Sequence, residues 1–75
     1  MELKRGSVVR SKAGRDRGFL AVLEYTERYA LLADGRDRPL ERPKRKNIRH
    51  LAATAHILSE DELATNRSLR RALTK

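Results

Sequence analysis

Hydrophobic residues in this chain occur in short runs that polar and glycine-containing stretches separate, a pattern typical of β-strands and turns. The first run is Val8 and Val9, the second covers residues 19–24, and the third covers residues 29–33. The second run is nearly all apolar, as expected for a central strand that is buried on both faces. The first half of the chain therefore predicts three consecutive strands.

Side chains on a strand point alternately to opposite faces, and this alternation divides the first predicted strand into two sides. It places Val9 and Ser11 on the inner side, and Val8, Arg10 and Lys12 on the outer side. We therefore expect the outer side of this strand to be basic near its end.

Turn signals and two further candidate strands follow the third strand. Asp34-Gly35 is a strong hairpin signal, and residues 36–42, which contain a proline, predict a short edge strand. Residues 44–47 predict an exposed basic run, and residues 48–51 predict the strand that closes the sheet. The chain is thus expected to contain five short strands.

Five short strands with turns about every eight to twelve residues indicate a mainly β fold. We predict a small SH3-like barrel over residues 1–51, followed by a C-terminal extension over residues 52–75. Within this extension, residues 52–58 are apolar without a clear period, which predicts an extended segment that crosses the barrel.

The end of the chain has the composition of a helix. A capping-box sequence starts at Ser59 and predicts a turn, and a short helix is predicted from Arg67. Leu69, Ala72 and Leu73 fall on one side of this helix, where they would pack against the barrel.

Charge is the largest signal in the composition. The 75 residues carry a formal net charge of +8, which in so small a domain indicates a polyanionic partner. Six basic and two acidic side chains in residues 1–18 give +4, and seven basic and two acidic side chains in residues 36–50 give +5. The positive charge therefore comes from two separate blocks, which a barrel could bring to one face.

The composition also excludes several classes of protein. The chain has no cysteine, so it forms neither a disulfide nor a thiolate metal site. No apolar run approaches the roughly 20 residues that span a bilayer, and the N-terminus lacks the apolar core of a signal peptide. We expect a soluble, cytoplasmic protein with no membrane partner.

A glycine-bounded basic loop joins the first two predicted strands. Gly14 and Gly18 allow positive φ angles and close backbone approach, and Arg15 and Arg17 lie between them at the tip of the turn. Arginine on such a tip can donate paired, charge-assisted hydrogen bonds to phosphate. The residues assigned to this first phosphate-contact surface are Arg10, Lys12, Gly14, Arg15, Arg17 and Gly18.

The second basic block predicts a second strip of phosphate contacts. It consists of Lys44, Arg45, Lys46 and Arg49. Contacts to phosphate position a nucleic acid without reading its sequence.

Aromatic residues are few, and this argues against a platform for single-stranded bases. The chain has Phe19, Tyr25 and Tyr29, and we expect Phe19 and Tyr29 in the core. A stacking platform normally needs two or three exposed rings. Folded RNA, recognised by shape and backbone, is therefore the expected partner.

One stretch resembles a known family motif. The pattern Gly6-x-x-Val9-x-x-x-x-Gly14-x-Asp16-x-Gly18, closed by an apolar strand, resembles the KOW motif of ribosomal proteins and transcription elongation factors. The wider likeness is to small bacterial KOW-domain RNA-binding proteins, which are similar to large-subunit ribosomal proteins of eukaryotes and archaea. The matching segments are residues 9–18, 32–35, 40–46 and 50–51.

This resemblance implies an SH3-like barrel that binds ribosomal RNA of the large subunit, as a ribosomal or ribosome-associated protein that also contacts ribosomal proteins. An alternative is a protein-interaction module that docks on RNA polymerase or another assembly through residues 52–58. A third hypothesis is a nonspecific DNA-coating protein.

No arrangement of residues points to catalysis. His50 and His56 are six positions apart without cysteine or a paired acidic cluster, a spacing that matches no metal site. No phosphate-binding P-loop or dinucleotide fingerprint occurs. We therefore predict a non-enzyme without cofactor, metal or small-molecule substrate.

Overall fold

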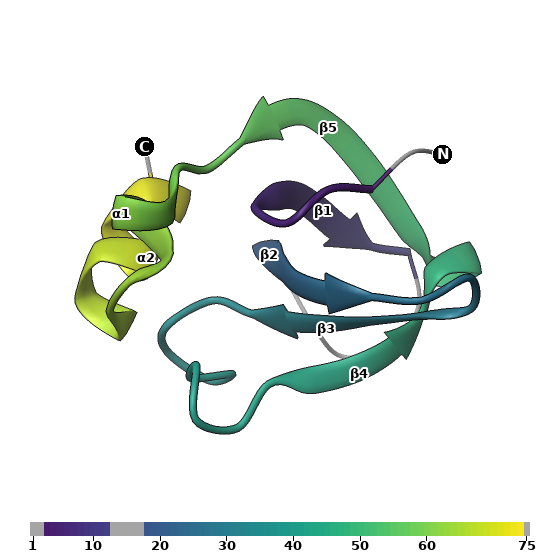
Figure 1. Ribbon diagram of the computed structural model, residues 1–75, viewed down its shortest axis with the longest axis horizontal. Helices are drawn as coiled ribbons and strands as arrows, with labels where there is room; N and C mark the ends of the chain where they lie inside the picture. The colour runs from purple at the N-terminus through teal and green to yellow at the C-terminus, as the bar shows by residue number, and fades with distance from the viewer. Residues whose placement is uncertain (1–2, 13–17, 75) are drawn as a thin grey trace.

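The structure is a computed structural model that describes residues 3–12 and 18–74, and it is mainly β (Figure 1). Within these residues, five strands form one antiparallel sheet in the order β4-β3-β2-β1-β5. The elements are β1 (Ser7–Ser11), β2 (Phe19–Tyr25), β3 (Tyr29–Ala33), β4 (Lys44–Asn47), the 3₁₀ turn η1 (Ile48–His50), β5 (Leu51–Ile57), α1 (Glu60–Leu63) and α2 (Asn66–Leu73). The predicted class, a small barrel-like β domain with a short C-terminal helix, is confirmed.

The sheet curls around a first hydrophobic core. Val9, Leu20, Val22, Leu32 and Leu51 point into it and are at most 2% exposed. Burying one such side chain stabilises the fold by about 1.5–3 kcal/mol. Four of the five strands supply these residues, so the core holds the curled sheet together.

The opposite face of the sheet carries a second core, which the C-terminal helices cover. Val8, Ala21 and Ala33 from the strands pack there with Leu63 of α1 and Leu69 of α2. β2 is the middle strand of the sheet, so the prediction that it is buried on both faces is confirmed.

The prediction for the helix is confirmed, and that for Val8 needs correction. Leu69 and Ala72 are buried, and Leu73 packs against the same core, as their spacing predicts. Val8 does point away from Val9, but it is only 5% exposed because the helices cover this end of the sheet. A strand pattern gives the two sides of a sheet, but not which part of each side another element covers.

The predicted fourth strand is wrong in position. Residues 36–42 form an irregular loop, and the basic run 44–47 is the strand β4 instead. Asp34 closes the loop, because its carboxylate accepts hydrogen bonds from the backbone N–H groups of Arg36 (2.8 Å) and Arg38 (2.9 Å). Proline within the loop has no N–H to donate to a strand ladder. The strand therefore starts only after Pro43.

The prediction of a closing strand over residues 48–51 is also wrong. Asn47 caps the turn η1 there by accepting a hydrogen bond from the Arg49 N–H at 3.0 Å. The following strand, β5, covers most of the segment predicted to be extended, and it pairs with β1. The sheet therefore continues beyond residue 51, where the sequence suggests the barrel ends.

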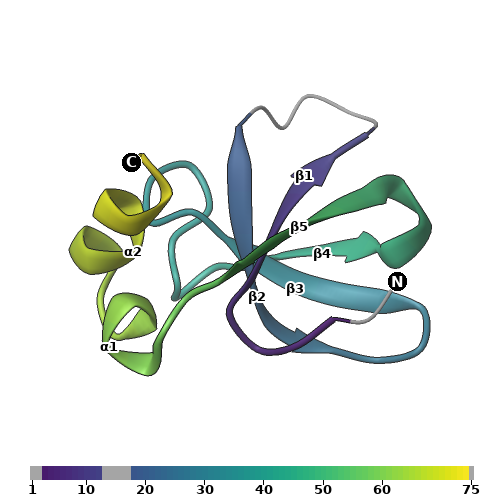
Figure 2. The same ribbon diagram turned by 90° about the horizontal axis from the view of Figure 1, so that it is seen from above.

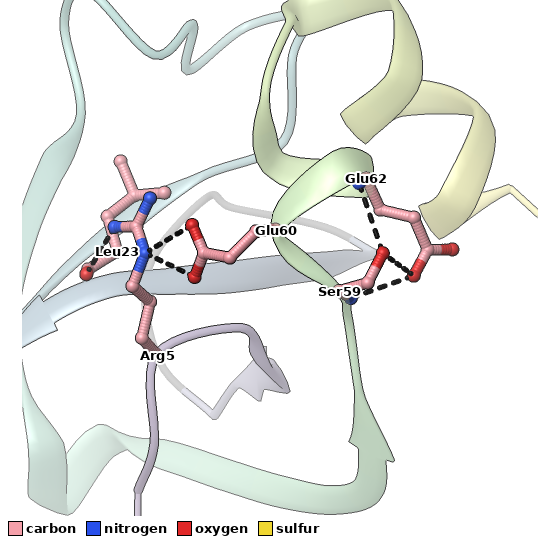
Figure 3. A network of polar contacts seen from close by, with 5 residues as sticks. All are labelled: Arg5, Leu23, Ser59, Glu60 and Glu62. Atoms are coloured by element: carbon pink, nitrogen blue, oxygen red, sulfur yellow. Dashed lines mark hydrogen bonds and ion pairs between the residues drawn. The ribbon is translucent and has the colours of Figure 1, made fainter.

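Polar contacts tie the C-terminal extension to the start of the chain (Figure 3). The Arg5 side chain lies 2.9 Å from the Glu60 carboxylate and donates a 3.0 Å hydrogen bond to the backbone oxygen of Leu23. Ser59 and Glu62 form the predicted capping box at the start of α1. The extension thus belongs to the same folded unit as the sheet.

Two glycines allow the extension to approach the sheet closely. Gly6 has φ +92°, and a Cβ at this position would lie 2.4 Å from the Leu58 backbone oxygen. Gly35 has φ +79°, and a Cβ there would lie 2.3 Å from the Asn66 backbone oxygen. Since neither position has room for a side chain, glycine is required at both.

Asn66 fixes the loop between β3 and β4 to the start of α2. Its side-chain oxygen accepts a hydrogen bond from the Leu40 N–H, and its side-chain N–H donates to Glu41, both at 2.7 Å. Two views place the helices at the opposite end of the sheet from η1 and the turn between β2 and β3 (Figures 1 and 2). Among the described residues, no helix is long and apolar enough to cross a membrane.

Candidate nucleic-acid interface

A basic groove lies at the end of the sheet that is remote from the helices. It has a volume of about 580 Å³ and receives side chains from the end of β1, the turn between β2 and β3, the end of β4, and η1. We call it the basic groove. Its lining residues are Lys12, Glu27, Arg28, Tyr29, Asn47, Ile48 and Arg49.

Backbone hydrogen bonds hold the three cations of this groove in place. The Lys12 N–H donates to the His50 oxygen at 2.6 Å, which fixes the end of β1 against η1. The Ile48 N–H donates to the Arg28 oxygen at 2.8 Å, which fixes the turn between β2 and β3 against the same element. Lys12, Arg28 and Arg49 therefore lie on three segments that backbone hydrogen bonds hold together.

The groove unites the two basic blocks of the sequence. Lys12 belongs to the first block and Arg49 to the second, and both line the same groove. Three cations face one carboxylate there, that of Glu27. Such a groove attracts an anion with repeated charges, such as a phosphate backbone.

Arg45 lies beside this groove and stacks on an aromatic ring. Its guanidinium carbon is 4.8 Å from the centre of the Tyr29 ring, a cation–π distance. Tyr29 itself is 39% exposed. The prediction that Tyr29 is a core residue is therefore wrong.

A second arginine and ring pair lies where β1 and β2 meet. The Arg10 guanidinium carbon is 5.9 Å from the centre of the Phe19 ring, and the two residues are direct partners in the ladder. Phe19 is 41% exposed, so the prediction that it lies in the core is also wrong. The apolar run of β2 therefore begins at Phe19, one residue before the part of the strand that the two cores bury.

The chain fold divides the basic run 44–46 between two faces. Lys44 pairs with Leu32 and Lys46 with Ala30, whereas Arg45 pairs with Leu31. Because paired residues share a face, both lysines lie on the side of the first core and Arg45 on the other side. Lys44 and Lys46 are half-buried and have polar or ring contacts, so the run is not one exposed strip.

The loop glycine that the structure describes, Gly18, has φ +77°, as the sequence predicts for this turn. No atom lies within 4 Å of the position of its missing Cβ. The predicted contact residues Gly14, Arg15 and Arg17 lie outside the described residues.

Five cations of the proposed surface have no carboxylate partner among the described residues. In residues 3–12 and 18–74, an ion pair is found at Arg5 but at none of the cations that follow. They are Arg10, Lys12, Arg28, Arg45 and Arg49. Since no carboxylate in the described ranges neutralises them, these cations can bind an external anion.

Sequence reasoning missed two residues of this surface. Arg28 lies in residues 19–35, which carry one basic and three acidic side chains, so the basic blocks of the sequence do not include it. Tyr29 begins an apolar strand and was expected to point inward. What the two residues share is their place at the turn between β2 and β3. In the folded chain this turn lies against η1, because the Ile48 N–H donates to the Arg28 oxygen.

No arrangement of side chains in the described ranges suits a metal ion, since no three His, Cys, Asp or Glu side chains gather there. No protein-family model matches the chain, and no curated protein matches it. Function must therefore be argued from the surface itself.

Proposed function

We propose that this protein binds folded RNA through the basic groove and the cations around it. The observation that carries the proposal is that Lys12, Arg28 and Arg49 line one groove and form no ion pair with any residue that the structure describes. Phosphate is the ligand that such a row of unpaired cations favours, because binding releases counterions from the nucleic acid. Arg15 and Arg17, in the loop that follows β1, are proposed to add to this surface.

The RNA that we propose is ribosomal RNA of the large subunit, which would make the protein ribosomal or ribosome-associated in the cytoplasm. This step rests on the resemblance of the glycine-bounded loop and its flanking strands to the KOW motif. Gly18 supports it, since it takes the positive φ that such a turn needs. The net charge of +8 agrees with a polyanionic partner.

Reversal of two groove charges tests the proposal. We expect Lys12→Glu with Arg49→Glu to weaken binding to a ribosomal RNA fragment at least about tenfold, since charge-assisted contacts are the stronger hydrogen bonds. The matched control is Arg67→Glu with Arg71→Glu on the exposed side of α2, remote from the groove. Both pairs change two residues by two charges each and so lower the net charge from +8 to +4.

Filter binding or fluorescence anisotropy of both variants gives a clear result. An equal loss of affinity in the two variants would mean that net charge alone attracts RNA and that the groove is not the site. Equal affinity of the wild type for duplex DNA and for ribosomal RNA would favour a DNA-coating protein.

One observation supports a second candidate, a protein-interaction module. β5 is an edge strand without Lys, Arg, Asp or Glu, it is largely exposed, and Ile57 on it is 50% exposed. An uncharged edge strand can pair with a strand of another protein. A protein complex of this kind would survive nuclease and moderate salt, whereas the proposed RNA complex would not.

A further inference from the structure

The basic groove has a neighbour of different chemistry. This second groove has a volume of about 350 Å³ and lies over β2, β3 and β4. We call it the tyrosine groove. Its lining residues are Glu24, Tyr25, Thr26, Tyr29, Ala30, Leu31 and Arg45.

Tyr29 lines both grooves, so a ligand in one groove is within reach of the other. The basic groove offers three cations. The tyrosine groove instead offers two aromatic rings, the side chain of Leu31, one guanidinium and the carboxylate of Glu24. A phosphate fits the first environment better than the second, because Glu24 repels it and the rings cannot donate enough hydrogen bonds to solvate it.

A flat, neutral group fits the tyrosine groove. Tyr25 is 49% exposed and Tyr29 is 39% exposed, so both rings keep large apolar areas in water. The Arg45 guanidinium carbon lies 4.8 Å from the centre of the Tyr29 ring. The guanidinium therefore adds a second planar surface beside the ring. Nucleobases stack on tyrosine rings and on arginine guanidinium planes.

We infer that the tyrosine groove binds one unpaired nucleobase of the RNA while the adjacent phosphates lie in the basic groove. This inference rests on the proposed function, and it adds that the preferred RNA has a bulged or looped nucleotide beside a helix. Tyr29 stands between the two subsites and stacks on the base. Glu24 accepts hydrogen bonds from the amino group of an adenine, cytosine or guanine base.

Two variants test the role of the Tyr29 ring while retaining strand β3. Tyr29→Phe keeps the ring and removes only the hydroxyl group. Tyr29→Val removes the ring but keeps a residue that favours strands, so β3 is expected to persist. Circular dichroism and thermal unfolding of both variants check that the fold is retained.

The probe is a hairpin RNA with a single bulged 2-aminopurine, compared with the same hairpin fully paired. We expect the wild type and Tyr29→Phe to bind the bulged hairpin at least about fivefold more tightly than the paired one, the lower end of the effect of one stacked base. Binding should also quench the 2-aminopurine fluorescence. Tyr29→Val should lose the preference and the quenching, so that it binds the two hairpins with equal affinity.

The possible failures are distinct. Equal binding of the two hairpins by the wild type, or an unchanged preference in Tyr29→Val, overturns the base subsite but leaves RNA binding intact. If the wild type binds neither hairpin, the proposed function itself fails, and this inference fails with it.

Discussion

Arginine has different surroundings at the two ends of the sheet. At the helix end, Arg5 lies 2.9 Å from the Glu60 carboxylate and donates to the Leu23 oxygen (Figure 3). Beside the basic groove, Arg45 lies over the Tyr29 ring and has no ion pair within the described ranges. Arg5 is thus held by partners within the fold, whereas Arg45 and the Tyr29 ring remain exposed and available to a ligand. This difference separates the part of the surface that serves stability from the part that we assign to binding.

The largest expected effect on stability is at the helix end. Leu69 is fully buried in the second core, so Leu69→Ala should lower the free energy of unfolding by about 2–5 kcal/mol. Urea denaturation measures this change. A loss below about 1 kcal/mol would mean that the helices contribute little to the fold and that the sheet is stable without them.

Two glycines give a matched comparison of a packed position and an open one. Both Gly6 and Gly18 have positive φ, but a Cβ on Gly6 would clash with the Leu58 oxygen, whereas a Cβ on Gly18 would meet no atom within 4 Å. We expect Gly18→Ala to lower the free energy of unfolding only by the backbone strain, on the order of 1 kcal/mol. Gly6→Ala should lower it clearly more, and equal losses in thermal unfolding would contradict the comparison.

The sequence predicted the fold class, the first three strands and the helical end, because these depend on local patterns. The period-two alternation around Val9 and the short apolar run of β2, with glycine before it, favour strands on local grounds alone. The fourth strand was misplaced because Lys44 to Asn47 have no apolar side chain to signal it. Its pairing with β3 is a long-range property that no local pattern contains.

The candidate site was predictable only in part. Charge indicated Lys12 and Arg49, and the structure places both in one groove. The exposure of Phe19 and Tyr29 was not predictable, because an aromatic residue at the end of a strand has the same local pattern whether the neighbouring elements cover it or not. Arg28 was missed for a similar reason, since its neighbours in sequence are acidic and its neighbours in space are basic.

The smallest expected effect concerns the ion pair at the helix end. Arg5 and Glu60 have side chains that are 49% and 73% exposed, so Arg5→Gln should lower the free energy of unfolding by at most about 1 kcal/mol and leave RNA affinity nearly unchanged. Arg49→Gln is the matched change at the groove end. It should weaken RNA binding and leave the free energy of unfolding nearly unchanged. A variant at Arg5 that weakens RNA binding as much as the one at Arg49 would erase the proposed division between the two ends.

The most direct test of the central claim is the salt dependence of RNA binding. If about five phosphates are neutralised, the logarithm of the binding constant should fall with the logarithm of salt concentration with a slope of roughly −3.5 to −4.5. Lys12→Glu with Arg49→Glu should make this slope less steep by about 1.4 to 1.8, since two contacts are lost. A wild-type slope near zero, or the same slope in this variant as in the wild type, would contradict a phosphate-binding role for the basic groove.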